Sequence, residues 1–166
     1  MELVLTEPPA LPDGFAARPM TEAEYAPWLR HSTEAYVESI ISSGSSDPVS
    51  AKAKADRDFA ELLRGLGTER MSLSVLESDG RPVGALWLGH HNPDTRTFVY
   101  NVEIDAAERG HGFGRAAMLA AEHLALAAGD RTIGLNVFGH NDVACGLYER
   151  LGYRVTDWTA GRELRS

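Results

Sequence analysis

The chain has 166 residues, a length that fits one domain with a substantial core. Hydrophobic residues make up 43% of the sequence and charged residues 24%, as is typical of globular proteins. The formal net charge of −8 at pH 7 argues against nucleic acid or an anionic membrane surface as the main partner. Such a charge is compatible with a cationic substrate such as an amine, and equally with a solvated acidic surface.

Cys145 is the single cysteine, so no disulfide can form within the chain and a reducing, cytoplasmic compartment is the simplest expectation. The first residues lack the positive charges and the apolar run of a signal peptide. No apolar stretch approaches the roughly 20 residues of a membrane helix. We therefore expect no membrane and no nucleic acid among the partners.

Residues 1–13 hold three prolines and are predicted to form an extended or poorly ordered lead. A single domain is predicted over residues 14–166. It begins with a short edge strand over 15–20, where Pro19 limits pairing.

Two helices follow the edge strand. Thr21 and Glu24 form a capping box before the first, and Asp47 with Pro48 begins the second. Apolar residues recur at helical spacing in both, which indicates core packing. The alternative interpretation is that the loop between these helices borders an acceptor pocket.

Three strands of an antiparallel meander are predicted next, the first from the alternation over 71–75. Asp79-Gly80 is a strong signal for a hairpin, and the return strand covers 83–88. The third strand covers 97–105, with an apolar alternation of Phe98, Tyr100, Val102 and Ile104.

A long alanine-rich helix is predicted from about residue 112 to 128, followed by a strand over 132–138. The connection should be a right-handed crossover, so this strand lies parallel to its partner. A further helix from Asn141 to Leu151 and one or two final strands after Tyr153, to about Leu164, complete the chain.

The turn over 109–115 reads Arg-Gly-His-Gly-Phe-Gly-Arg and joins a strand to a helix. This layout presents free backbone N–H groups and the positive end of a helix dipole, which suit a phosphate or pyrophosphate. The three glycines allow a close approach because they lack Cβ atoms. The spacing excludes the dinucleotide fingerprint and the P-loop, although plain tight turns of this composition also occur.

Asn141 and Tyr148 lie seven residues apart, so they share one face of their helix. The pattern R-x-x-G-x-G at 109–114 and the pattern N-x-x-A-x-x-L-Y-E-x-x-G-Y at 141–153 resemble the coenzyme A loop and the C-terminal motif of the GNAT family of N-acetyltransferases. The resemblance covers roughly Phe15 to the C-terminus. It implies an α/β fold with a mixed, mostly antiparallel central sheet, splayed between its fourth and fifth strands, and helices on both faces.

The resemblance implies that acetyl-coenzyme A is the co-substrate and that an acetyl group moves to a primary amine by direct transfer in a ternary complex. The pyrophosphate is expected on the N–H groups of residues 110–115, and the pantetheine in the splayed gap beside 103–105. Arg115 faces either a phosphate or solvent, and Asn141 either contacts the pantetheine or only caps its helix. The residues expected to bind acetyl-coenzyme A are Ile104, Arg109, Gly110, His111, Gly112, Phe113, Gly114, Arg115 and Asn141.

Tyr148 matches the tyrosine that protonates the departing thiolate in the family. A tyrosine with a pKa of roughly 10 is protonated at neutral pH, whereas a thiol has a pKa of roughly 8.5, so donation is chemically reasonable. Packing in the core is the alternative role. Cys145, near the same face, is interpreted as a small buried residue rather than a covalent nucleophile.

An acceptor amine with a pKa near roughly 10.4 must lose a proton before it attacks. Glu103 is the first candidate for the base, because it points away from the face of Val102 and Ile104. Asp105 is the second, and His90, His140 or a chain of waters remain alternatives. His90 and His91 are expected to point to opposite faces of a strand, so no metal site is predicted.

A second hypothesis is a non-catalytic domain that binds or senses acyl-coenzyme A. The sequence leaves the identity of the acceptor open among polyamines, aminoglycosides, amino acids, peptide N-termini and protein lysines. An exposed terminal strand also allows pairing into a homodimer.

Overall fold

The computed structural model describes residues 1–44, 46–92, 94–137 and 141–156. No helix in these ranges combines the length and the apolar character needed to cross a membrane. Along the chain the elements are β1 (Glu2–Val4), β2 (Phe15–Pro19), α1 (Glu22–Ser42), α2 (Pro48–Leu62), β3 (Met71–Ser78), β4 (Arg81–Gly89), β5 (Arg96–Ile104), the 3₁₀ turn η1 (Ala106–Glu108), α3 (Phe113–Ala127), β6 (Thr132–Leu135) and α4 (Asp142–Arg150).

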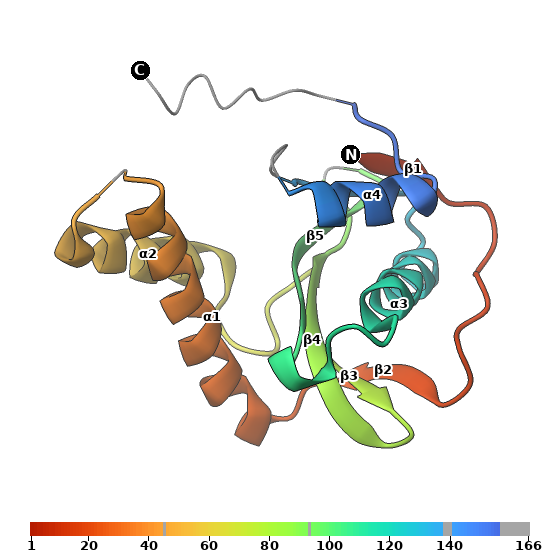
Figure 1. The fold of residues 1–166 in the computed structure, drawn as a ribbon, viewed down its shortest axis with the longest axis horizontal. Helices are drawn as coiled ribbons and strands as arrows, with labels where there is room; N and C mark the ends of the chain where they lie inside the picture. The colour runs from red at the N-terminus through yellow and green to blue at the C-terminus, as the bar shows by residue number, and fades with distance from the viewer. Residues whose placement is uncertain (45, 93, 138–140, 157–166) are drawn as a thin grey trace. The chain divides into compact units, whose positions relative to one another are not determined.

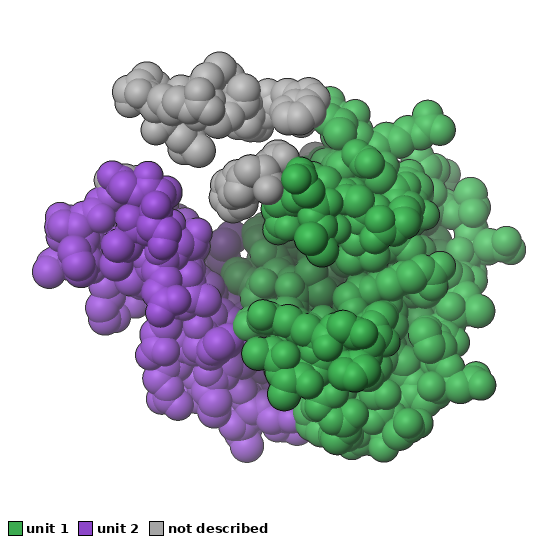
Figure 2. Space-filling model, viewed as in Figure 1, with its two compact units in different colours: residues 1–19, 70–158 green, residues 20–69, 159–166 purple. Residues whose placement is uncertain are grey.

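The chain forms two compact units, which Figure 2 shows in green and purple. The first unit comprises residues 1–19 and 70–158 and holds the sheet with α3 and α4 (Figure 1). The second comprises residues 20–69 and 159–166 and holds α1 and α2.

The sheet has six strands in the order β1-β6-β5-β4-β3-β2. Neighbouring strands run antiparallel except β5 and β6, which are parallel. The predicted meander of β3, β4 and β5 is confirmed, and so is the parallel crossover through α3. The predicted α/β fold with a mixed, mostly antiparallel sheet is therefore the observed one.

Local sequence signals account for the β3–β4 turn and for the edge of the sheet. Asp79 and Gly80 have φ values of 51° and 77°, the left-handed pair that a two-residue hairpin turn requires. β2 ends at Pro19 and lies at the edge of the sheet, as predicted, because proline cannot donate to a further strand.

β1 is a strand that the sequence does not predict, because three residues are too few to show an alternation. It pairs with β6 over residues 132–134. On its other side Glu2 forms an isolated bridge with Arg154. The final strands predicted after Tyr153 lie mostly outside the described residues.

Helix α3 packs against one face of the sheet through small side chains. Its buried positions are mostly alanine, which lets the helix approach the strands closely, while β3, β4 and β6 supply larger side chains. This packing fixes the first turn of α3 beside the end of β5 (Figure 1). The largest apolar side chains that are almost completely inaccessible to solvent are Leu76, Leu86, Leu88, Met118, Ile133 and Val83.

β5 carries a bulge that the sequence does not reveal. Trp87 pairs with Asn101 but Leu88 pairs with Val99, so Tyr100 is an extra residue in the strand. A bulge changes the face of the sheet that each later residue of the strand occupies. No pattern of residues in this part of the sequence predicts it.

The bulge overturns the prediction that the apolar residues of this strand alternate on one face. Val102 and Ile104 pack against the core under α3, together with Val99. Tyr100 instead stacks on Trp87, with ring centroids 4.8 Å apart. The predicted run therefore divides between the two faces of the sheet.

In the second unit, the predicted helix starts are confirmed. Glu24 accepts hydrogen bonds from the N–H and the hydroxyl of Thr21, both at 2.9 Å. Asp47 accepts from two backbone N–H groups at 3.0 Å. A hydrogen bond of 2.9 Å from the hydroxyl of Tyr36 to Asp58 links α1 to α2.

Candidate functional site

The glycine turn lies between η1 and α3 and faces open space. Gly110 and Gly112 have φ values of 84° and 79°, in the left-handed region that favours glycine. A Cβ atom added at either position would meet no other atom within 4 Å. The turn thus combines a backbone conformation that other residues resist with room for a ligand.

Six successive backbone N–H groups, from Gly110 to Arg115, have no hydrogen-bond partner among the described residues. The preceding bond runs from the N–H of Arg109 to the carbonyl of Ala106, and the first bond of α3 runs from Ala116 to Gly112. The N-cap residue of α3 is glycine, so no side chain caps the helix. These donors, at the positive end of the α3 dipole, suit an anion.

Three side chains of the turn have defined positions. His111 donates through Nδ1 to the carbonyl of Glu108 at 3.0 Å. Arg109 donates through Nε to the carbonyl of Ile104 at 3.1 Å, and Arg115 is exposed in the first turn of α3. The two arginines therefore flank the row of amides with positive charge.

β5 pairs with β6 only in its first half. Residues 96–99 of β5 pair with 132–135 of β6, and within the described residues the register goes no further, although β5 continues to Ile104. The bulge at Tyr100 lies where this pairing stops, and a bulge bends its strand. The predicted splay between the two strands is therefore observed, and the bend accounts for it.

The backbone of Ile104 points toward the parted side. Ile104 lies opposite Gly84, and the N–H of Asp105 donates to the carbonyl of Val83 at 2.8 Å. In an antiparallel ladder this pattern turns the N–H and C=O groups of Ile104 away from β4. By the same alternation, the backbone N–H and C=O groups of Val102 also point away from β4. The edge of β5 beyond its pairing with β6 therefore offers backbone donors and acceptors.

Tyr148 lies in α4, beside the first turn of α3. A Cβ atom added to Gly114 would lie 3.6 Å from Leu147, so the two helices touch there. Tyr148 packs against the same core as Ile104 and Phe113. Burial of the Tyr148 phenol, with a smaller effect of Cys145, raises its pKa. Tyr148 is therefore protonated at neutral pH, as a proton donor must be.

Asn141 is the N-cap of α4 in this structure. Its side-chain oxygen accepts from the N–H of Ala144 at 3.2 Å, and the residue is exposed. Helix capping is one of the two roles that the sequence allowed. The amide NH₂ of Asn141 donates to no other described residue.

Glu103 and Tyr148 lie on different sides of β5. Glu103 is half-buried and alternates with Val102 and Ile104, so it faces away from α3. Asp105 is exposed and follows directly after the strand. Tyr148 and Glu103 therefore approach the end of β5 from opposite faces of the sheet.

The prediction that His90 and His91 point to opposite faces is wrong. His91 has a φ of 53°, because it lies in the turn after β4, and both rings approach Asp130. His91 Nδ1 lies 2.6 Å from Asp130 Oδ1, and the hydroxyl of Thr97 donates to Oδ2 at 2.6 Å. Burial raises the pKa of Asp130, but these hydrogen bonds outweigh it and lower the pKa.

This cluster lies at the opposite end of β5 from the glycine turn and links the β4–β5 turn to the end of α3. Burial lowers the pKa of His90, which favours its neutral form. Across the described ranges no three His, Cys, Asp or Glu side chains gather as a metal site would require. His140, another candidate base, lies outside the described residues.

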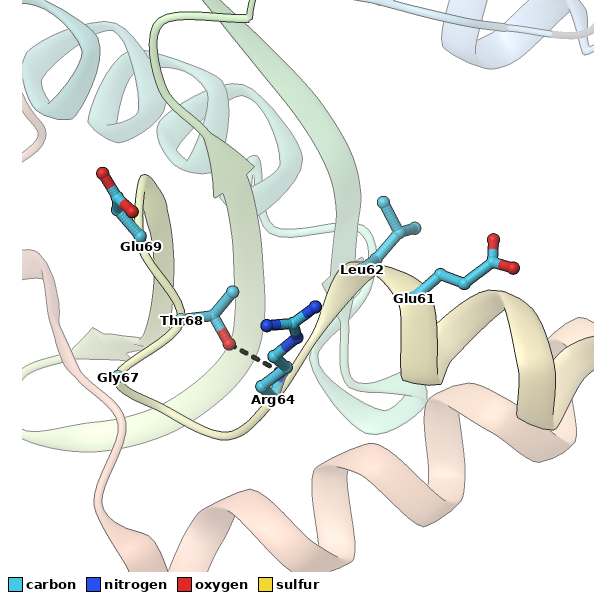
Figure 3. A pocket seen from close by; sticks show the side chains of 6 residues that line it. All are labelled: Glu61, Leu62, Arg64, Gly67, Thr68 and Glu69. Carbon is cyan, nitrogen blue, oxygen red and sulfur yellow. Dashed lines mark hydrogen bonds between the residues drawn. The ribbon is translucent and has the colours of Figure 1, made fainter.

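The second unit contains an open cavity of about 450 Å³ after the C-terminal end of α2 (Figure 3). The hydroxyl of Thr68 accepts a hydrogen bond from the N–H of Arg64 across it, at 2.8 Å. The lining mixes carboxylates with a guanidinium, so charge alone favours neither a cation nor an anion. It consists of Glu61, Leu62, Arg64, Gly67, Thr68 and Glu69.

Two buried polar groups of the first unit were not singled out from the sequence. Glu122 is 7% exposed within α3, and burial raises its pKa to about 7. Tyr153 is 3% exposed, and its hydroxyl has no hydrogen-bond partner among the residues that the structure describes. The burial of Glu122 could have been suspected from the sequence, because it is the single carboxylate in the mostly apolar run over 116–126.

The mixed sheet with α3 packed on it places the protein in the α/β class, and the amides at the start of α3, which have no partner among the described residues, suit an anion. The model of the acetyltransferase (GNAT) family matches residues 26–153, and the chain belongs to this family.

Similar proteins span the length of the chain. The uncharacterized N-acetyltransferase YycN of Bacillus subtilis is 31% identical over 150 residues, which cover 88% of this chain and 96% of YycN. The crystal structure of YycN matches with a TM-score of 0.80. The uncharacterized N-acetyltransferase YdgE of the same organism is 25% identical over 154 residues, which cover 90% of this chain and 98% of YdgE.

More distant structures share the fold. AAC(6')-Iy, in complex with the bisubstrate analog CoA-S-monomethyl-acetylneamine, has a TM-score of 0.61 at 14% identity, covering 88% of this chain and 95% of its own. At this identity the likeness shows the fold alone.

Proposed function

We propose that the protein transfers an acetyl group from acetyl-coenzyme A to a primary amine, directly within a ternary complex. The row of six unbonded amides at the end of a parted strand carries this proposal. Membership of the acetyltransferase family and the N-acetyltransferase names of YycN and YdgE support the reaction class.

In this proposal the backbone N–H groups of residues 110–115 bind the pyrophosphate of the co-substrate. These amides fit such a group, because a Cβ at Gly110 or Gly112 would meet no atom within 4 Å and no described residue accepts a hydrogen bond from them. Arg109 and Arg115 add positive charge. The backbone groups of Ile104 bond the amide-containing pantetheine arm as a neighbouring strand would.

Glu103 acts as the base that takes a proton from the amine, with Asp105 or a water chain as alternatives. The amine nitrogen then attacks the thioester carbonyl, the C–N bond forms and the C–S bond breaks, leaving the electron pair on sulfur. Tyr148 gives its phenolic proton to this sulfur. The raised pKa of Tyr148 keeps that proton available at neutral pH.

The test is the rate of coenzyme A release with a panel of amines, for the wild type and Tyr148→Phe. We expect kcat of Tyr148→Phe to fall at least about tenfold, because general acid catalysis contributes that much or more, with little change in the KM for acetyl-coenzyme A. Tyr36→Phe, which removes a phenol from α1, is the matched control. An unchanged rate in Tyr148→Phe removes Tyr148 from the chemistry. Acetyl-coenzyme A binding without any acetylated amine instead supports a non-catalytic binding domain.

A further inference from the structure

The bulge residue Tyr100 is fixed on the face of the sheet away from α3. Its ring stacks on Trp87 with centroids 4.8 Å apart and meets Phe98 edge-on at 5.0 Å. Gly89 leaves room for this ring, because a Cβ atom added there would lie 2.5 Å from Tyr100 Cε2. The hydroxyl of Tyr100 accepts a hydrogen bond of 2.8 Å from the side-chain NH₂ of Asn92. Ring contacts and a hydrogen bond thus define the position of the residue that interrupts the strand.

Asn92, in the β4–β5 turn, is held by Arg96, the first residue of β5. The N–H of Asn92 donates to the carbonyl of Arg96 at 2.7 Å, and Arg96 Nε donates to the carbonyl of Asn92 at 3.0 Å. The guanidinium carbon of Arg96 also lies 5.8 Å from the centre of the Phe98 ring. Arg96 therefore fixes the turn that carries the hydrogen-bond donor of Tyr100.

An ion pair joins Arg96 to the N-terminal strand across β6. Arg96 Nη1 donates to the carboxylate of Glu2 in β1. Gly134 of β6 lies between them, and a Cβ atom added there would be 3.3 Å from Glu2 Cγ and 3.5 Å from Arg96 Cδ. Gly134 lies outside the left-handed region, so room for these two side chains accounts for the glycine better than backbone conformation does. A connected set of contacts thus runs from β1, over β6, to the bulge in β5.

We propose that Tyr100 is a positioning residue that keeps β5 apart from β6 for coenzyme A, and that its contacts through Asn92 to β1 stabilise this arrangement. The inference rests on the proposed binding of the pantetheine arm beside Ile104. Pairing with β6 ends at Val99, directly before Tyr100. If the bulge relaxed, β5 would continue alongside β6, and the backbone groups of Val102 would pair with that strand instead of a ligand. An edge that is open before binding avoids this competition.

The affinity for coenzyme A then depends on the fraction of molecules in which the strands are parted. The apparent dissociation constant equals the intrinsic constant divided by this fraction. The exchange rate of the Val102 N–H with solvent is proportional to the same fraction, because pairing with β6 protects it. A variant that loses one hydrogen bond of the parted state should therefore weaken binding and slow this exchange by the same factor, up to about fivefold.

The first test uses Tyr100→Phe, which keeps the ring and removes only the acceptor of the Asn92 bond. Calorimetry should give a dissociation constant for coenzyme A that is about two- to fivefold higher, and NMR should show Val102 exchange in the free protein slowed by the same factor. A variant that only loosened the fold would speed this exchange instead. Tyr36→Phe, which breaks the Tyr36–Asp58 bond of the second unit, is the matched control and should change neither quantity. An unchanged dissociation constant, or a higher one with unchanged Val102 exchange, overturns the proposal.

The second test uses Arg96→Met, which removes the ion pair with Glu2 and the bond to Asn92. Both quantities should move in the same direction as in Tyr100→Phe. Arg131→Met, at an exposed arginine directly before β6, is the control and should change neither. If Arg96→Met also changes neither, the support from β1 is refuted. The exchange measurement needs no coenzyme and no turnover, so it still decides whether Tyr100 keeps the strands apart if the wild type fails to bind coenzyme A, a result that would refute the proposed function instead.

Discussion

Replacing Glu122 by glutamine should stabilise the protein at neutral and alkaline pH. The pKa of Glu122 rises from 4.5 to about 7 on folding, because the side chain is only 7% exposed. Between pH 4.5 and about pH 7 the folded state therefore keeps a proton on Glu122 that the unfolded chain has already released. The contribution of Glu122 to the free energy of unfolding is fully present below pH 4.5. It is lost as the pH rises through the pKa of the folded state.

The size of the effect follows from the shift. A difference of about 2.5 pKa units, at about 1.36 kcal/mol per unit, makes the ionised Glu122 cost about 3 kcal/mol above pH 7. Glu122→Gln lacks this cost, so its free energy of unfolding should exceed that of the wild type at about pH 8 by up to this amount. Near pH 4.5 the two proteins should have similar stability.

Urea denaturation at several pH values, with equal m-values for the two proteins, measures the difference. The reasoning requires that the difference grows with pH between 4.5 and about 7 and then levels off. A difference that is independent of pH would show that folding does not change the pKa of Glu122. A variant that is less stable at about pH 8 would show that the carboxylate has a favourable partner.

Two further predictions concern the glycine turn and the Asp130 cluster. Gly112→Ala places a side chain at a φ of 79°, so it should cost about 1 kcal/mol of stability and raise the KM for acetyl-coenzyme A. The control is Gly129→Ala, with a φ of 87° beyond the end of α3, which should cost the same stability and leave that KM unchanged. Equal KM values in the two variants would contradict the assignment of residues 110–115 as the binding turn. Asp130→Asn removes the negative charge and replaces one of the two accepting oxygens by an NH₂ group, so the Thr97 and His91 bonds cannot both remain. The change should lower the free energy of unfolding at pH 7 by about 2 kcal/mol, with no change in this KM. Because the pKa of Asp130 lies below its ordinary value, the loss should shrink as the pH falls through the folded-state pKa, and urea melts at acidic pH check this.

The parts of the fold that depend on neighbouring residues could be predicted from the sequence. Asp79-Gly80 determines its turn by its own backbone preferences, and Asp47 caps α2 with its own carboxylate. The glycine turn belongs to the same group, because Gly110 and Gly112 are needed locally for the left-handed backbone.

The parts that depend on distant partners could not be predicted. The bulge at Tyr100 exists because of the register that β5 adopts with β4, and Tyr100 itself carries no sign of it. His91 approaches Asp130 only because the fold brings the end of α3 to the β4–β5 turn. β1 forms only because β6 offers a free edge, and its length gives no pattern.

The candidate site shows the same division. Tyr148 and the glycine turn were assigned from local motifs, and the structure places both beside the first turn of α3. The burial of Glu122 depends on the whole sheet packing against α3, so its raised pKa is invisible in the sequence.

The most direct test of the binding site is an amide NMR titration of the protein with coenzyme A. We predict that the largest shift changes fall on the N–H signals of residues 110–115 and of Ile104. The former have no partner among the described residues, and the latter points away from β4. Saturable binding that leaves these signals unmoved, with the changes concentrated elsewhere in the chain, would contradict the account.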